Sequence, residues 1–214
     1  MPDLDFQVEG AEAVPHAATP LLALLLRVST KPKDEPVHSA VLKCQVRIDA
    51  PGRAYDPREE EGLGDLFGPR ARWGTTLRNL LWTNVHTTLP AFEENVLVDL
   101  PIPCTYDLNV AAAKYFHSLQ EGSVPLTLLF SGTVFYEGEQ GVLQVSPVPW
   151  SKQARFALPV ATWKEVIDLH FPNAGYVTLQ REVLDRLYRY KVRRGLPTWE
   201  RALESLLARA EAEA

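Results

Sequence analysis

The chain has 214 residues, of which 46% are apolar and 23% charged, and its formal net charge is −5. This composition is typical of a globular protein and argues against general disorder, and the acidic excess argues against a protein whose main task is neutralising nucleic-acid phosphates. We expect a cytoplasmic protein, because residues 1–5 are acidic where a secretory signal is basic, and the longest apolar run, 21–26, is too short to span a membrane.

The first part of the chain predicts β-strands. Residues 4–9 alternate apolar with polar, and residues 21–30 are apolar on both faces as far as Arg27, which is typical of a central strand. The clearest alternation covers residues 42–48 and places Cys44 on the face that packs on the core.

A short helix is predicted next. Asp56 suits the N-cap, Pro57 the first helical position and Glu59 the third position of a capping box, and Gly68 followed by proline ends the pattern. Residues 73–89 fit both helical and strand spacing, and we predict mostly strand for them.

Further strands are predicted over 96–102, 124–136 and 142–148, the last two forming a hairpin, and a short helix over 107–119 with Asn109 as its cap. Pro101 and Pro103 limit the first of these strands to an edge or a strand end, because proline cannot donate to a ladder of hydrogen bonds.

From residue 158 the pattern becomes helical. A capping box at 162–165 predicts the start of one helix, 179–194 forms a second, and a third begins at Thr198, with residues 210–214 fraying. The predicted fold class is therefore α+β, with an antiparallel β-sandwich-like body over residues 1–157 and a helical C-terminal region over 158–214 packed on it.

The two cysteines, Cys44 and Cys104, form no CxxC pair, and we expect two reduced thiols in the core. An immunoglobulin-type disulfide is disfavoured, because Trp73 is far from the first cysteine and Ile102 stands where that pattern has tyrosine. The five histidines form no pair with metal-ligand spacing, so neither a metal nor a cofactor is predicted.

No catalytic residue is predicted either. Asp168 and His170 lie two positions apart on a helix and point away from each other, and Ser131 lies in a strand without the glycine-flanked turn of a nucleophile. The glycines at 62, 64 and 68 lack the spacing of a phosphate loop. An enzyme whose groups meet only in the fold, in a cleft between the β body and the C-terminal helices, stays open as an alternative.

The most function-like stretch is 186–194, where cations alternate with Tyr188 and Tyr190. We predict that it binds an acidic protein partner through five side chains: Arg186, Arg189, Lys191, Arg193 and Arg194. A single-stranded nucleic acid is a disfavoured alternative ligand, and the plainest alternative is a solvated helix face with cations near the negative end of the helix dipole.

Several segments together carry a resemblance: RWGTTL at 72–77, LPIPCTYD at 100–107, LFSGTVF at 129–135, PW at 149–150 and GLPTW at 195–199. The chain resembles an uncharacterised family of bacterial proteins associated with nickel-iron hydrogenase gene neighbourhoods. The resemblance supplies no site residues and implies a cytoplasmic accessory protein that helps to assemble, mature or dock a metalloenzyme. The leading hypothesis is thus a non-enzymatic protein-binding or assembly factor.

Overall fold

The computed structural model describes residues 2–31, 36–105, 110–138, 141–174 and 179–213. It divides into two compact units, Met1–Ala174 and Gly175–Ala214. None of the helices in these described stretches combines the length and the apolarity needed to cross a membrane.

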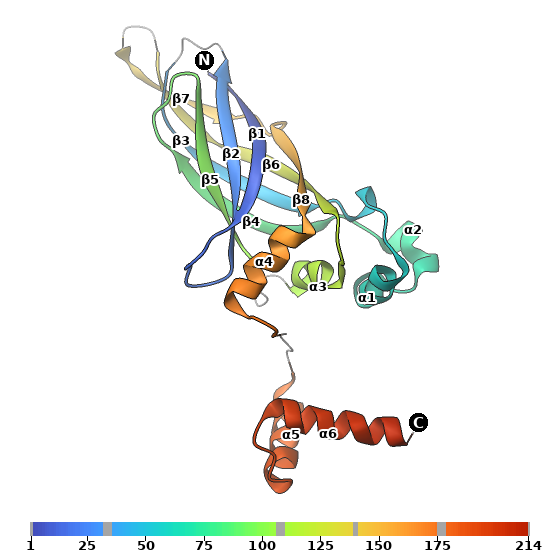
Figure 1. Ribbon diagram of the computed structural model, residues 1–214. Coiled ribbons are helices and arrows are strands. Elements are labelled where there is room, and N and C mark those ends of the chain that lie inside the picture. The colour runs from blue at the N-terminus through green and yellow to red at the C-terminus, as the bar shows by residue number, and fades with distance from the viewer. Residues whose placement is uncertain (1, 32–35, 106–109, 139–140, 175–178, 214) are drawn as a thin grey trace. The chain divides into compact units, whose positions relative to one another are not determined.

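The first unit contains two antiparallel sheets (Figure 1). The three-stranded sheet has the order β1-β2-β5, with β1 at Asp3–Ala13, β2 at Leu21–Lys31 and β5 at Asn95–Pro103. The second sheet has the order β4-β3-β6-β7, and β8 also pairs with β6. Its strands are β3 (Val37–Ile48), β4 (Leu80–Leu89), β6 (Ser123–Glu137), β7 (Leu143–Val148) and β8 (Gln153–Pro159).

The core lies between the sheets because each strand buries alternate side chains. In β3 the buried positions include Leu42, Cys44 and Val46, as the alternation predicts. Phe6 of β1 and Phe130 of β6 stack with ring centroids 4.1 Å apart, so side chains of the two sheets meet directly. The predicted α+β fold with a sandwich-like antiparallel body is confirmed.

Helices gather at one end of the strands in Figure 1: α1 (Pro57–Phe67), α2 (Trp73–Thr76), α3 (Val110–Ser118) and α4 (Val160–His170). Short 3₁₀ turns occupy Ala50–Gly52 and Arg70–Arg72. Phe116 of α3 stacks on Trp163 of α4 at 5.1 Å and contacts Trp82 of β4 at 4.8 Å, so aromatic rings extend the core to this end. The predicted capping box of α1 is confirmed, with Asp56 accepting from the Glu59 amide at 2.9 Å.

The prediction of mostly strand for residues 73–89 is confirmed over Leu80–Leu89. Residues 73–76 form a helix, because Trp73 Nε1 donates to the Gly68 carbonyl at 2.8 Å and Thr76 Oγ1 donates to the Phe67 carbonyl at 2.6 Å, which holds the segment against the end of α1. The sequence pattern does not predict strand β8. The predicted capping box at 162–165 is wrong, since α4 begins at Val160, whose amide donates to the Gly122 carbonyl.

The chain divides after Ala174, so α4 belongs to the first unit, whereas the sequence placed the boundary after residue 157. The second unit contains α5 (Arg181–Arg193) and α6 (Trp199–Ala212). Thr198 caps α6 by accepting from the Arg201 amide at 3.2 Å, and Gly195, at φ 63°, ends α5. Helix α6 continues to Ala212, past the start of the predicted fraying. The Asn109 cap lies outside the described residues. Helix α4 packs on the first unit through Trp163, and the packing of the second unit on the body stays a prediction.

Candidate functional site: a protein-interaction surface on the second unit

The five cations predicted to bind a partner do not form one group. At about 100° per residue, Arg186, Arg189 and Arg193 fall within an arc of about 60° on one side of α5. Their guanidinium groups lie back along the helix: Arg189 Nε donates to the Asp185 carbonyl at 3.2 Å and Arg193 Nε to the Arg189 carbonyl at 3.3 Å. These three form the exposed basic stripe of α5.

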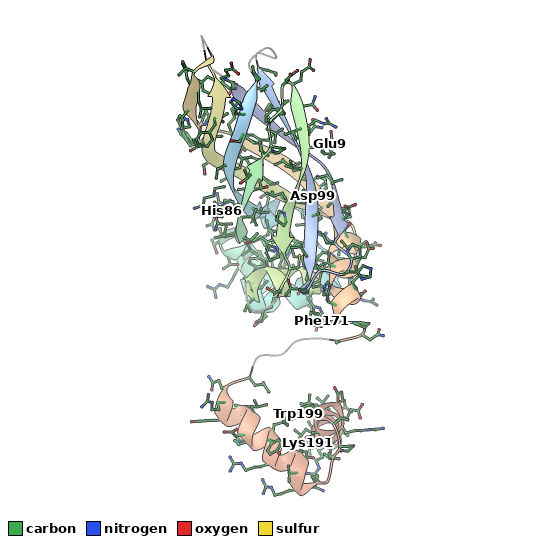
Figure 2. The ribbon with its side chains drawn as sticks, turned by 90° about the vertical axis from the view of Figure 1, so that its left-hand side faces the viewer. Glu9, His86, Asp99, Phe171, Lys191 and Trp199 are labelled. Atoms are coloured by element: carbon green, nitrogen blue, oxygen red, sulfur yellow. The ribbon has the colours of Figure 1, made fainter. Side chains whose placement is uncertain are left out.

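The other two cations contact aromatic rings. Lys191 Nζ lies 5.7 Å from the ring centroid of Trp199 on α6, and the two side chains are labelled in Figure 2. The Arg194 guanidinium lies 5.9 Å from the ring of Tyr190, whose hydroxyl is 2.7 Å from Ser205 Oγ. Because cations are attracted to the faces of aromatic rings, Lys191 helps to join α5 to α6, whereas Arg194 packs on Tyr190 within α5.

The packing of α5 and α6 within the second unit leaves an apolar surface exposed, and sequence reasoning missed it. On α5 it comprises Leu184, Tyr188 and Val192, which are four residues apart and are 42%, 54% and 58% exposed. On α6 it comprises Leu203, Leu206 and Leu207, all likewise exposed. We call these six residues the apolar surface of the second unit.

A buried polar cluster in the first unit also contains groups that enzymes use. Glu59 of α1 is 2% exposed, and its Oε1 accepts from Arg53 Nη2 at 2.6 Å and from the Gln120 amide at 2.8 Å. Tyr55 and Tyr115 join their hydroxyls at 2.8 Å, and burial raises the pKa of both phenols. Each of these groups is hydrogen-bonded to another group of the protein, and the cluster connects α1 to the segment that leads into β6.

Among the residues weighed as catalytic in the sequence, His170 has structural partners. His170 Nδ1 lies 3.1 Å from the Val166 carbonyl and Nε2 lies 3.0 Å from the Ala17 carbonyl, so the ring bridges α4 and the loop before β2. Ser131 lies in β6 opposite Lys43, and Gly62 and Gly64 lie within α1, which Gly68 caps.

The cysteines are free thiols, as predicted. Both are buried, Cys44 in the five-stranded sheet and Cys104 just after β5, and burial raises the pKa of each to about 12. Among the described residues no three His, Cys, Asp or Glu side chains are grouped as metal ligands.

Two shallow hollows adjoin His38 at the start of β3. One, of about 300 Å³, is lined by His38, Phe92, Glu93 and Glu137 among others, and its neighbour, of about 410 Å³, by His38, Ser39, Phe135 and Leu143. No hydrogen bond or ion pair joins the titratable side chains of the first hollow in the described structure, so it offers no assembled reactive group. The enzyme alternative, with a site in a cleft between the β body and the C-terminal helices, stays a prediction.

Comparison with known proteins yields a family without an assigned role. Residues 1–214 match the model of a family of unknown function, DUF6084. No curated protein matches the chain. A crystal structure of the putative ApaA protein from Bordetella pertussis is similar at 14% identity and a TM-score of 0.26, covering 73% of this chain and 93% of that one. A β-glucosidase 3B from Thermotoga neapolitana, solved with α-D-glucose, is similar at 15% identity and a TM-score of 0.25 and covers 73% of this chain but 17% of its own. Similarities at these TM-scores carry no argument about function.

Proposed function

The chain belongs to the family of unknown function DUF6084, and we propose that it is a non-enzymatic accessory factor that binds a protein partner. The observation that carries the proposal is the apolar surface of the second unit. Six large apolar side chains lie uncovered on two helices. Removal of apolar area from water is favourable by about 25 cal/mol per Å². Covering these side chains therefore favours the association of a partner.

The chemistry of the partner follows from the charge of α5. Residues 181–194 carry six cations and two carboxylates, in a chain whose net charge is −5. The basic stripe of Arg186, Arg189 and Arg193, centred about 130° around α5 from the apolar residues, therefore favours a partner that also presents Asp and Glu. Helix α6 carries three carboxylates, those of Glu200, Glu204 and Glu211, which would repel the phosphates of a nucleic acid laid across both helices.

We also propose a setting for this binding: a cytoplasmic factor serving the assembly or maturation of a nickel-iron hydrogenase. The support for the setting is the resemblance carried by the segments at 72–77, 100–107 and 129–135. The binding proposal stands on the second unit alone, so the two parts can fail separately.

Co-purification of the tagged full chain from native cells tests both parts. One variant replaces Leu184 and Val192 by serine, and a second replaces Arg189 and Arg193 by glutamate. The matched control replaces Val41 and Leu97, which are exposed to a similar extent on the first unit, by serine. We expect both test variants to lose a partner that the wild type and the control retain, with unchanged helical circular dichroism.

Two outcomes would count against the proposal. Recovery of the wild type with no other protein bound to it under mild lysis would contradict partner binding. Retention of the same partner by both test variants would move its site away from the second unit. Identification of the partner by mass spectrometry decides the hydrogenase setting, which a partner unrelated to hydrogenase would refute.

A further inference from the structure

The free edge of β7 is a further exposed feature of the first unit. Strand β7 pairs antiparallel with β6, and in the described part of the chain no other strand pairs with β7 (Figure 1). An unpaired edge presents backbone donors and acceptors that can pair with another strand. This edge belongs to the first unit and is independent of the surface proposed above.

The backbone groups on the free side can be identified from the register. Gly138 N donates to the Val142 carbonyl at 2.9 Å, so the even-numbered residues of the strand direct their groups to β6. The odd-numbered residues Leu143, Val145 and Pro147 therefore direct theirs to the free side. Pro147 has no N–H, but its backbone faces away from β6, so the missing donor does not interrupt the hydrogen bonds between β7 and β6. The free donors of β7 are thus the amides of Leu143 and Val145.

The side chains at this edge are apolar and uncharged. Leu143 and Val145 are 58% and 60% exposed, and Trp150, in the turn after β7, is 90% exposed. Residues 142–149 contain no charged residue, although charged residues make up 23% of the chain. Proteins usually protect an exposed edge with lysine or other charges, and β7 has none.

We propose that β7 pairs antiparallel with β7 of a second copy of this chain, about a two-fold axis at Val145. In this register each Val145 amide donates to the carbonyl of the other copy's Val145, and each Leu143 amide donates to the carbonyl of the other copy's Pro147. All the free amide donors of the two strands then find acceptors. Pro147, which has no N–H, lies opposite Leu143 and needs only to accept, through its carbonyl, a hydrogen bond from the Leu143 amide.

A second copy fits this edge better than a charged partner does. The uncharged segment offers no ionic attraction to an acidic or basic peptide, and two copies of it meet without repulsion. Pairing also consumes the only free side of β7, so the contact closes at two copies and does not propagate. The rows of Leu143, Val145 and Pro147 from both copies then form one apolar band on the joined sheet.

Chemical cross-linking of the full chain tests the register. In a hydrogen-bonded antiparallel pair the two Val145 Cα atoms are about 5.5 Å apart. Val41, which is 47% exposed on β3 of the same sheet, would lie more than about 24 Å from its counterpart, which is five strand spacings away. Val145→Cys treated with a short bismaleimide should give a product of twice 24.0 kDa, and Val41→Cys should stay at 24.0 kDa. The buried Cys44 and Cys104 contribute little background.

Sedimentation equilibrium provides the second measurement. The wild type should approach twice 24.0 kDa as its concentration rises, and Val145→Lys, which opposes two ammonium groups across the axis, should weaken dimerisation by about 100-fold or more. Val41→Lys should leave dimerisation unchanged. A wild type that stays monomeric at every soluble concentration would overturn the proposal. So would equal cross-linking of the two cysteine variants, or a dimer that survives Val145→Lys.

Discussion

Replacement of Glu59 by alanine should destabilise the first unit strongly, because it breaks a buried ion pair. The side chains of Arg53 and Glu59 are only 10% and 3% exposed. Besides Glu59, Arg53 donates to the carbonyls of Glu121 and Ser123 at 2.8 and 3.1 Å. Glu59→Ala leaves the guanidinium without its counter-charge and removes the acceptor of the Gln120 amide.

The magnitude follows from these contacts. Removal of one partner of a buried ion pair costs about 3–5 kcal/mol. Glu60→Ala is the matched control, since Glu60 follows in the same first turn of α1 and pairs with Arg70, whose side chain is 63% exposed. Both substitutions remove the same favourable interaction with the helix dipole, and loss of the exposed pair adds less than about 1 kcal/mol.

Thermal and urea unfolding followed by tryptophan fluorescence measure this difference. Trp73, Trp82 and Trp163 are buried in the first unit, so their emission reports its unfolding. At about 2–4 °C per kcal/mol, Glu59→Ala should lower the Tm by about 6–20 °C. The double variant Arg53→Met with Glu59→Leu should recover part of the loss, because it removes both charges. A Tm for Glu59→Ala within a few degrees of that for Glu60→Ala would refute the reasoning.

Two further predictions concern a close backbone approach and the buried thiols. Gly132 of β6 has φ 151°, and an added Cβ would lie 2.1 Å from the Val41 carbonyl oxygen, so Gly132→Ala should cost about 3 kcal/mol or more in urea unfolding. Gly74→Ala, whose Cβ meets nothing within 4 Å, serves as control, and equal stability of the two variants would contradict the clash. Cys44 and Cys104 should resist thiol reagents in the folded protein at neutral pH and react after denaturation. Since the pKa of each rises from 9.0 to about 12 on folding, the folded state holds more protons between these values and stability falls as pH rises. The loss should be about 1.4 kcal/mol per thiol at pH 10, and urea unfolding that is unchanged between pH 8 and pH 10 would exclude it.

The strands of the body could be predicted because local patterns and tertiary contacts agree there. In β3 the alternation of Leu42, Cys44 and Val46 with polar residues matches a sheet that is buried on one face. The start of α1 was equally readable, because Asp56 and Glu59 satisfy each other's backbone amides within one turn. Such signals depend on residues at most a few positions apart.

The errors arose where a distant residue decides the structure. Thr162 and Glu165 have the spacing of a capping box, yet the Gly122 carbonyl accepts from Val160 and starts α4 earlier. Strand β8 pairs with the first half of β6, and β7 pairs with the second half. The alternation of residues in β6 does not indicate that two strands share one of its edges. The Arg53–Glu59 pair also joins residues whose closeness depends on α1 docking beside the segment before β6.

The candidate site shows a different limit of periodicity. Helical spacing along α5 separates an apolar arc from the face that carries Arg186, Arg189 and Arg193, but spacing alone does not say what covers the apolar arc. A helix that packs on its own chain and a helix that packs on another protein share one pattern. In the second unit Tyr190 and Ala202 mark where α5 and α6 meet, and Leu184, Val192 and Leu207 are left over. The functional proposal rests on these exposed apolar residues. Only coordinates can distinguish them from the apolar residues that are buried between α5 and α6.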